Sequence, residues 1–220
     1  MAGSTPPWGK QTATACLVLA DGTVIYGRGL GAAGEAAAEV VFNTALTGYQ
    51  EILTDPSYTG QIVTFTFPHI GNVGANGEDI EDLNPALRAG AVGAIFRADI
   101  TAPSNYRSGS HLDDWLKRRG VIAMAGLDTR ALTALIREKG SPNAVIAHAP
   151  DGVFDIEALK AKARDWSGLV GLDLAKEVTS GQSSVWTEGP WVWNEGYGEA
   201  GEPTMHVVAV DYGIKRNILR

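Results

Sequence analysis

The chain has 220 residues, 45% of them hydrophobic and 20% charged, and it carries a formal net charge of −7 at pH 7. These fractions are typical of a globular protein and exclude wholesale disorder. The acidic balance argues against nucleic-acid binding, for which Lys and Arg usually cluster on one face. No apolar run approaches the ~18 residues that a membrane-spanning helix needs. We therefore expect a protein that binds neither nucleic acid nor a membrane.

Cysteine and histidine usage favours a chain without disulfides or metal. The one cysteine, Cys16, permits no internal disulfide and no cysteine-based zinc site. The four histidines lie far apart and lack ligand spacing; they are His69, His111, His148 and His206. A reducing cytoplasm is the simplest setting for such a chain. Residues 1–11 lack the apolar core of a signal peptide, so residues 1–12 are expected to form a disordered tail.

The first half of the chain is rich in strand signals. Two β-like runs flank Asp21-Gly22, which predicts a hairpin with a type I′ turn, in which both central residues have positive φ. Further runs rich in Val, Ile, Thr and Phe are expected to be strands, at residues 39–43, 61–67 and 91–96.

From residue 110 onward, helices and strands are expected to alternate. Capping signals predict helices that begin at Ser110, where Asp113 completes a capping box, and at Asp128 and Asp155. Gly120 ends the first of these helices. Short apolar strands are expected at residues 121–125 and 144–147. The pattern predicts an α/β protein with a partly parallel, helix-covered sheet beside a more β-rich first half.

Residues 180–204 are expected to be a connector, because they hold five glycines, two prolines and neither Lys nor Arg. Their three tryptophans are expected to pack on a neighbouring domain rather than stack on bases, since a nucleic-acid groove also needs cations. Residues 205–210 form an apolar run that ends at Asp211, and they are expected to be the first strand of a new α/β domain. The remaining residues are too few for a domain of ordinary size.

No complete catalytic apparatus is visible in the residues themselves. Residues 29–34 match Gly-x-Gly-x-x-Gly, but only residues 35–38 precede the next strand, too few for a helix that would hold a pyrophosphate. Cys16 lies in a predicted strand without a nearby cation, so a small buried core residue is favoured over a nucleophile. The sequence also contains no Gly-x-Ser-x-Gly, His-Glu-x-x-His or Walker pattern. No catalytic residue is therefore assigned.

Two turn-rich segments leave alternatives open. Asp55-Pro56-Ser57 is a turn signal; the Ser57 hydroxyl either reaches a ligand or belongs to a capped surface turn, and the residues alone favour the turn. His69, between Pro68 and Ile70, is either catalytic or hydrogen-bonded for structural reasons, and the second is favoured.

Six segments together carry a more specific pattern. They are Phe42-Asn43-Thr44, residues 46–58 (from Leu-Thr-Gly-Tyr to Asp-Pro-Ser-Tyr), 68–74 (Pro-His-Ile-Gly-Asn-Val-Gly), 127–133 (Leu-Asp-Thr-Arg-Ala-Leu-Thr), 174–178 (Leu-Ala-Lys-Glu-Val) and 208–219 (Val-Ala-Val-Asp-Tyr-Gly-Ile-Lys-Arg-Asn-Ile-Leu). In this order they resemble the small subunit, or glutamine amidotransferase chain, of glutamine-dependent carbamoyl-phosphate synthase. The resemblance covers about residues 14–220.

The resemblance implies two domains and a partner. In the family, an N-terminal β/β/α layered domain docks onto a large subunit, and a flavodoxin-like class I glutaminase domain follows, whose Cys, His and Glu hydrolyse glutamine. The large subunit uses the ammonia, bicarbonate and ATP to make carbamoyl phosphate for arginine and pyrimidine biosynthesis. The expected boundaries are residues 13–166 for the first domain, 167–204 for the connector and 205–220 for the start of a truncated glutaminase domain.

For this chain, the resemblance places the catalytic Cys, His and Glu beyond Arg220. It thus implies a truncated product or incomplete gene that is inactive alone, with no cofactor in this chain, since ATP and a metal ion belong to the large subunit. The one family site residue that is carried over is Ser57, which contacts the substrate glutamine. The alternative is a non-catalytic interaction module that docks on the large subunit.

Overall fold

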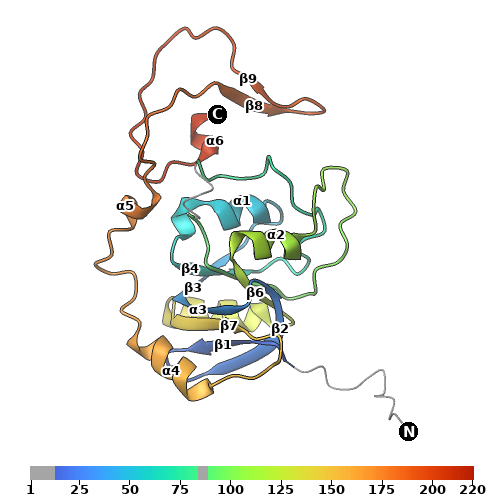
Figure 1. The fold of residues 1–220 in the computed structure, drawn as a ribbon, viewed down its shortest axis with the longest axis vertical. Helices are drawn as coiled ribbons and strands as arrows, with labels where there is room; N and C mark the ends of the chain where they lie inside the picture. The colour runs from blue at the N-terminus through green and yellow to red at the C-terminus, as the bar shows by residue number, and fades with distance from the viewer. Residues whose placement is uncertain (1–12, 84–88) are drawn as a thin grey trace.

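The computed structural model describes residues 13–83 and 89–220, so the expected tail at 1–12 lies outside the described residues. Seven strands of the described part close into a barrel in the order β1-β2-β6-β5-β4-β3-β7 (Figure 1). They are β1 (Ala15–Leu19), β2 (Val24–Gly31), β3 (Gly34–Asn43), β4 (Gln61–Phe65), β5 (Gly93–Ile95), β6 (Ile122–Ala125) and β7 (Asn143–His148).

Helices lie between the barrel strands in the chain, and others come after the last barrel strand, β7. They are α1 (Tyr49–Thr54), the 3-10 turn η1 (Pro56–Tyr58), α2 (Leu112–Arg119), α3 (Thr129–Lys139), α4 (Ile156–Asp165), α5 (Leu174–Val178) and α6 (Arg216–Leu219). Figure 1 shows α1 and α2 at one end of the barrel and α4 at the other, with α6 and the β8–β9 segment beyond α1. Within the described ranges, no helix combines the length and the apolar character that crossing a membrane requires.

The mixed α/β class is confirmed, but the two halves of the chain do not form separate layers. β3, β4, β5 and β6 pair in parallel, each with the next, whereas β1, β2 and β7 join them by antiparallel pairs. β2 pairs with β6, and β7 pairs with both β1 and β3. Strands from the early and late parts of the chain are therefore neighbours in one closed sheet. Closure pairs the backbone N–H and C=O groups that the edge strands of two separate sheets would leave unpaired.

The barrel strands are buried on both faces, which explains their nearly continuous apolar sequences. In β1, Ala15, Leu17 and Leu19 belong to a cluster that takes alternate residues from the barrel strands, so it fills the interior. Cys16 and Val18 point the other way and pack with Leu159 of α4. The alternation follows from the two-residue period of a strand.

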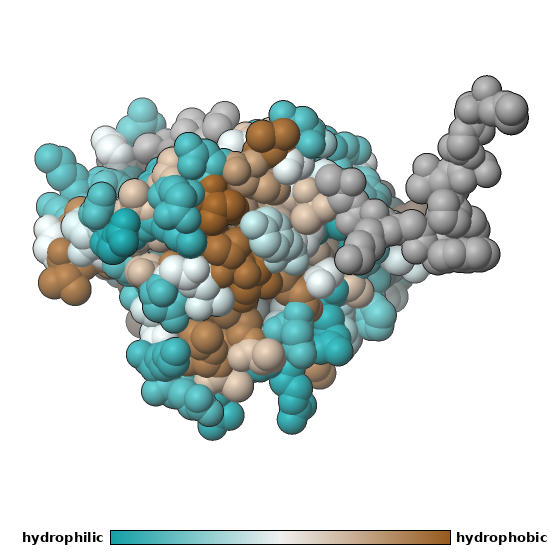
Figure 2. Space-filling view, turned by 90° about the horizontal axis from the view of Figure 1, so that it is seen from below, coloured by the Kyte–Doolittle hydropathy of each residue, from teal (hydrophilic) through white to brown (hydrophobic). Residues whose placement is uncertain are grey.

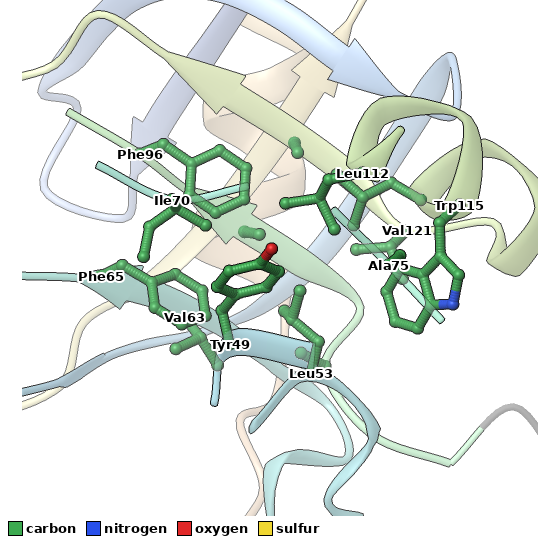
Figure 3. Close-up of a cluster of buried hydrophobic side chains, with 14 of the residues drawn as sticks. Tyr49, Leu53, Val63, Phe65, Ile70, Ala75, Phe96, Leu112, Trp115 and Val121 are labelled. Carbon is green, nitrogen blue, oxygen red and sulfur yellow. The ribbon is translucent and has the colours of Figure 1, made fainter. Parts of the chain in front are cut away.

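A second cluster lies between the barrel and the end covered by α1 and α2 (Figure 3). Phe65 is the last residue of β4 and Phe96 directly follows the neighbouring parallel strand β5, and their ring centroids are 5.5 Å apart. Tyr49 of α1 points into this cluster and donates its hydroxyl hydrogen to the carbonyl oxygen of Gly74. Burial raises the pKa of Tyr49 to about 12, so the phenol stays protonated.

At the opposite end of the molecule, apolar side chains form an exposed band bordered by hydrophilic ones (Figure 2).

Two local predictions are wrong in detail. In the β1–β2 turn only Gly22 has positive φ, so the turn is not type I′. The Leu19 amide donates to the Thr23 carbonyl, which makes a three-residue loop, and the Asp21 carboxylate accepts the Thr23 amide at 2.9 Å. The cap of α2 is His111 rather than Ser110, because the His111 ring Nδ1 accepts the Asp113 amide at 3.2 Å.

The connector is more structured than expected. Residues 180–204 contain a two-stranded sheet, β8 (Glu188–Val192) and β9 (Gly196–Glu199). Two of its tryptophans pack on the preceding part of the chain, as predicted: Trp193 meets the Tyr106 ring edge-on at 5.9 Å, and the Arg107 guanidinium lies 5.4 Å from the Trp191 ring centroid.

The expected strand at residues 205–210 is not a strand in this structure. Its apolar side chains are largely exposed, with Met205 and Val207 both at 81%. No strand of the described part pairs with this run, so its backbone lacks the ladder of hydrogen bonds that would define a strand.

The buried cluster that contains Phe65 and Phe96 is expected to contribute most of the stability at the end of the barrel covered by α1 and α2. Phe96→Ala leaves a cavity in a fully buried site and should lower the free energy of unfolding by about 3–5 kcal/mol. Urea denaturation of the 220-residue chain measures this change. Val153→Ala is the control, because Val153 is 73% exposed and its truncation should change the free energy by less than about 0.5 kcal/mol. Equal effects of the two substitutions would contradict the assignment of this core.

Candidate functional site

The turn that carries Ser57 is fixed by its own residues. Asp55 follows α1, and its Oδ1 accepts the backbone N–H of Ser57 at 2.8 Å. Pro56 occupies the first position of η1, where its fixed φ suits a helical start and its missing N–H removes no bond. Ser57 itself is exposed, and its hydroxyl forms no hydrogen bond with any other described residue. The turn therefore presents a free hydroxyl on a rigid backbone.

The C-terminal segment of the chain returns to this turn. Lys215 Nζ donates to Asp55 Oδ2 at 2.8 Å, across 160 positions of sequence. Gly213 lies close by: a Cβ on it would come within 3.6 Å of Pro56 Cβ and 2.6 Å of Val178 Cγ2. Its φ of 99° also favours glycine. One carboxylate, that of Asp55, thus holds both the Ser57 amide and the Lys215 ammonium.

Further hydrogen bonds join residues 216–217, which follow Lys215, to Glu81 and Asp82. The Glu81 carboxylate, only 4% exposed as a residue, accepts the backbone and side-chain N–H groups of Asn217 at 3.0 and 2.5 Å. Arg216 donates through its amide to the Glu81 carbonyl and through Nε to the Asp82 carbonyl. The Asp82 carboxylate pairs with Arg119 at 2.5 Å. These partners offset much of the cost of burying the two acids, although Asp82 Oδ1 has no hydrogen-bond partner among the described residues.

The charges at both ends of residues 211–215 are stabilised in their ionised forms. Burial alone would raise the pKa of Asp211, but the N–H groups of Ile214, Ser180 and Gly213 bond its carboxylate and hold the pKa below its usual value. The hydrogen bond to Asp55 raises the pKa of Lys215. Asp211 thus stabilises the segment above the pKa of an unfolded aspartate, and this is lost as the pH falls through the lowered value. The Lys215 contribution is present below the unfolded lysine pKa and is lost as the pH rises through the raised value.

The other residues that the sequence singled out do not join this site. Cys16 is fully buried, and burial together with the nearby Glu35 charge raises the pKa of its thiol to about 11, which suits a core residue and not a nucleophile. His69 is exposed, and within residues 13–83 and 89–220 the expected structural hydrogen bond of its ring is not found. Gly29 and Gly31 belong to β2 and Gly34 opens β3, which confirms that no helix follows this glycine pattern.

Sequence reasoning missed Lys215, Glu81 and Asp82. Lys215 and Asp55 are separated by 160 positions, and no local pattern marks one as the partner of the other. An acidic pair at 81–82 is typical of an exposed loop, and nothing in its spacing reveals that α6 will cover it. The groups that could have pointed to the site are the turn at Asp55 and the segment 208–219, which the resemblance already includes.

The shared carboxylate of Asp55 can be tested directly. Asp55→Asn keeps an acceptor for the Ser57 amide but removes the ion pair with Lys215. In this ion pair the Asp55 side chain is 13% exposed and the Lys215 side chain is 36% exposed. The partial exposure limits the expected loss to about 1 kcal/mol of local stability. Hydrogen exchange should therefore quicken at the Ile214 and Asn217 amides.

Glu35→Gln is the matched control, because it breaks the ion pair with Lys162 on another part of the surface. It should leave exchange of both amides unchanged. Unaltered exchange in the Asp55→Asn variant would show that Asp55 does not hold the C-terminal segment.

Comparison with known proteins bears on this geometry. Residues 17–146 match the family described as carbamoyl-phosphate synthase small chain, CPSase domain. The carbamoyl phosphate synthase small chain of Mesorhizobium japonicum is 78% identical over 216 residues, covering 98% of this chain and 54% of that one. Those of Agrobacterium fabrum and Rhizobium meliloti are each 73% identical, over 98% and 99% of this chain and 54% and 55% of theirs. The chain therefore spans about half the length of these relatives.

Among solved structures, an aminopeptidase from Aneurinibacillus sp. strain AM-1 has 17% identity and a TM-score of 0.37, covering 63% of this chain and 31% of that one. A likeness of this size establishes no common fold. The family match, in contrast, covers most of the chain from β1 to β7 and includes the Ser57 turn with its Asp55 anchor. By this match and these relatives, the chain belongs to the carbamoyl-phosphate synthase small chain family.

Proposed function

We propose that this chain acts as the N-terminal part of a glutamine-dependent carbamoyl-phosphate synthase small chain. In this proposal the complete small chain hydrolyses glutamine and delivers ammonia to a large chain, which makes carbamoyl phosphate from bicarbonate and ATP for arginine and pyrimidine biosynthesis in the cytoplasm. The observation that carries the proposal is the contact of the Ser57 turn with residues 211–217, through Asp55 and Lys215.

Ser57 contacts the substrate glutamine in this proposal. Three features support the role: the hydroxyl is exposed, it has no partner among the described residues, and its backbone is held by Asp55. A hydroxyl that bonds a charged amino or carboxylate group contributes about 1.5–3 kcal/mol, more than it does with a neutral partner. The position of the turn beside residues 211–215 lets one side of the substrate site come from the first domain and the other from the domain that follows.

Residues 205–210 open a flavodoxin-like glutaminase domain in this proposal. Their side chains, which are apolar except for His206, are exposed here, whereas a parallel strand in a helix-covered sheet is buried on both faces and has this kind of sequence. The division into a first domain at 13–166, a connector at 167–204 and the start of a glutaminase domain at 205–220 belongs to the same proposal. The nucleotide and the metal ion belong to the large chain, which is also the docking partner.

The role of Ser57 predicts a change in substrate affinity. In the complete small chain assembled with its large chain, Ser57→Ala should raise the KM for glutamine at least about fivefold, since a lost hydrogen bond is worth about 1 kcal/mol or more. Steady-state ammonia release at varied glutamine concentration measures this. Ser141→Ala removes another exposed serine hydroxyl and should leave KM unchanged. An unchanged KM in the Ser57 variant would remove Ser57 from the glutamine site.

The proposal also predicts what the 220-residue chain does by itself. It should release no ammonia from glutamine above the uncatalysed rate, because its one cysteine is buried with a raised thiol pKa. The complete small chain is the positive control, assayed under the same conditions. Ammonia release that disappears in a Cys16→Ser variant of the 220-residue chain would contradict this assignment of the chemistry.

A further inference from the structure

A pocket of about 500 Å³ lies among residues that the glutamine site does not use. Three of its lining residues are arginines, Arg97, Arg130 and Arg137, and hydroxyl groups come from threonines on both of its sides. Ligand pockets of small molecules generally have volumes of ~300–1,000 Å³, so the size suits a small metabolite.

The pocket lies at the carboxyl ends of parallel strands. Thr44 directly follows β3, Thr66 directly follows β4, and Arg97 comes two residues after β5. These three strands run parallel, so the residues that follow them meet at one edge of the sheet. In α/β sheets this edge is the usual place for ligands, because loops and helix N-termini converge there.

Helix α3 supplies the opposite wall. Arg130, Thr133 and Arg137 are three, four and seven positions apart, so they share one face of the helix and line the pocket. The other face is held in the barrel core by Leu132 and Ile136. Core packing of α3 therefore fixes the position of the backbone that carries Arg130 and Arg137.

The charges around the pocket are unbalanced in favour of cations. Arg97 has one acidic contact, Asp128, at 3.4 Å, and Asp128 is also the cap that accepts the Arg130 and Ala131 amides. Arg130 and Arg137 have no carboxylate within ion-pair distance among residues 13–83 and 89–220. One acid therefore faces three guanidinium groups, in a protein whose net charge is −7.

We propose that this pocket binds the phosphate group of a small phosphorylated metabolite. Guanidinium groups match the geometry of phosphate oxygens, and threonine hydroxyls donate further bonds to them. The volume exceeds what one phosphate ion fills, which leaves room for an organic part of the ligand. The inference is independent of the glutamine site, because it uses neither Ser57 nor its neighbours.

Isothermal titration of the 220-residue chain tests the proposal with two probes, inorganic pyrophosphate and glycerol phosphate. We expect saturable binding of at least one, weakened at least about tenfold by Arg130→Gln together with Arg137→Gln, as loss of charged hydrogen bonds requires. Tighter binding of glycerol phosphate would support an organic phosphate as the ligand, and tighter binding of pyrophosphate would contradict the organic part of the proposed ligand. Thr133→Val keeps every charge and should weaken binding by a smaller factor, which provides a second variant if the double variant unfolds.

The matched control is Arg164→Gln, which removes the charge of an exposed arginine on α4 and should leave binding unchanged. Sulfate at equal ionic strength is the ligand control. Absence of saturable binding by both probes, equal affinity in the variants and the wild type, or equal affinity for sulfate and pyrophosphate would each overturn the proposal.

Discussion

Closure of the barrel by β7 is the constraint on which the rest of the structure depends. β7 pairs with β1 on one side and β3 on the other, so a strand near residue 145 joins two strands from the first fifth of the chain. Both faces of the closing strand are buried, one in the barrel interior and one under α4. Because the sheet has no free edge at this seam, the carboxyl ends of β3, β4 and β5 are held in one fixed arrangement.

That arrangement positions both the Ser57 turn and the arginine pocket. The chain leaves β3 toward α1 and the Ser57 turn before it returns as β4, so the turn is tied to the barrel at both ends. Asn43, the last residue of β3, also donates to the Tyr58 hydroxyl at 2.9 Å. The arginine pocket uses the residues that come directly after the same strands. One sheet thus supports both surfaces, and the segments that follow its strands carry their exposed polar side chains.

The sequence predicted the elements well where the signals are local. Asp128 and Asp155 cap their helices as expected, Gly120 follows the end of α2, and the strands at 121–125 and 144–147 lie within one residue of their observed bounds. It failed where geometry depends on distant partners. The barrel pairs β2 with β6 across almost one hundred positions, and the contact of Lys215 with Asp55 spans even more. His111, and not Ser110, caps α2. Both residues carry a hydrogen-bond acceptor and they are adjacent in sequence, so residue preferences do not show which of them will be the cap.

The docked hairpin β8–β9 restricts the segment that comes after it in the chain. A free connector of this length would let its far end explore a large volume, so any attached body would rarely meet the Ser57 turn. Trp191 and Trp193 instead hold the hairpin against Arg107 and Tyr106, and Arg220 stacks on Tyr197 within it. These contacts limit the positions that residues 211–220 can reach. They raise the effective concentration of residues 211–220 at the Ser57 turn, so that a weak single contact such as one ion pair is sufficient to keep this segment at the turn.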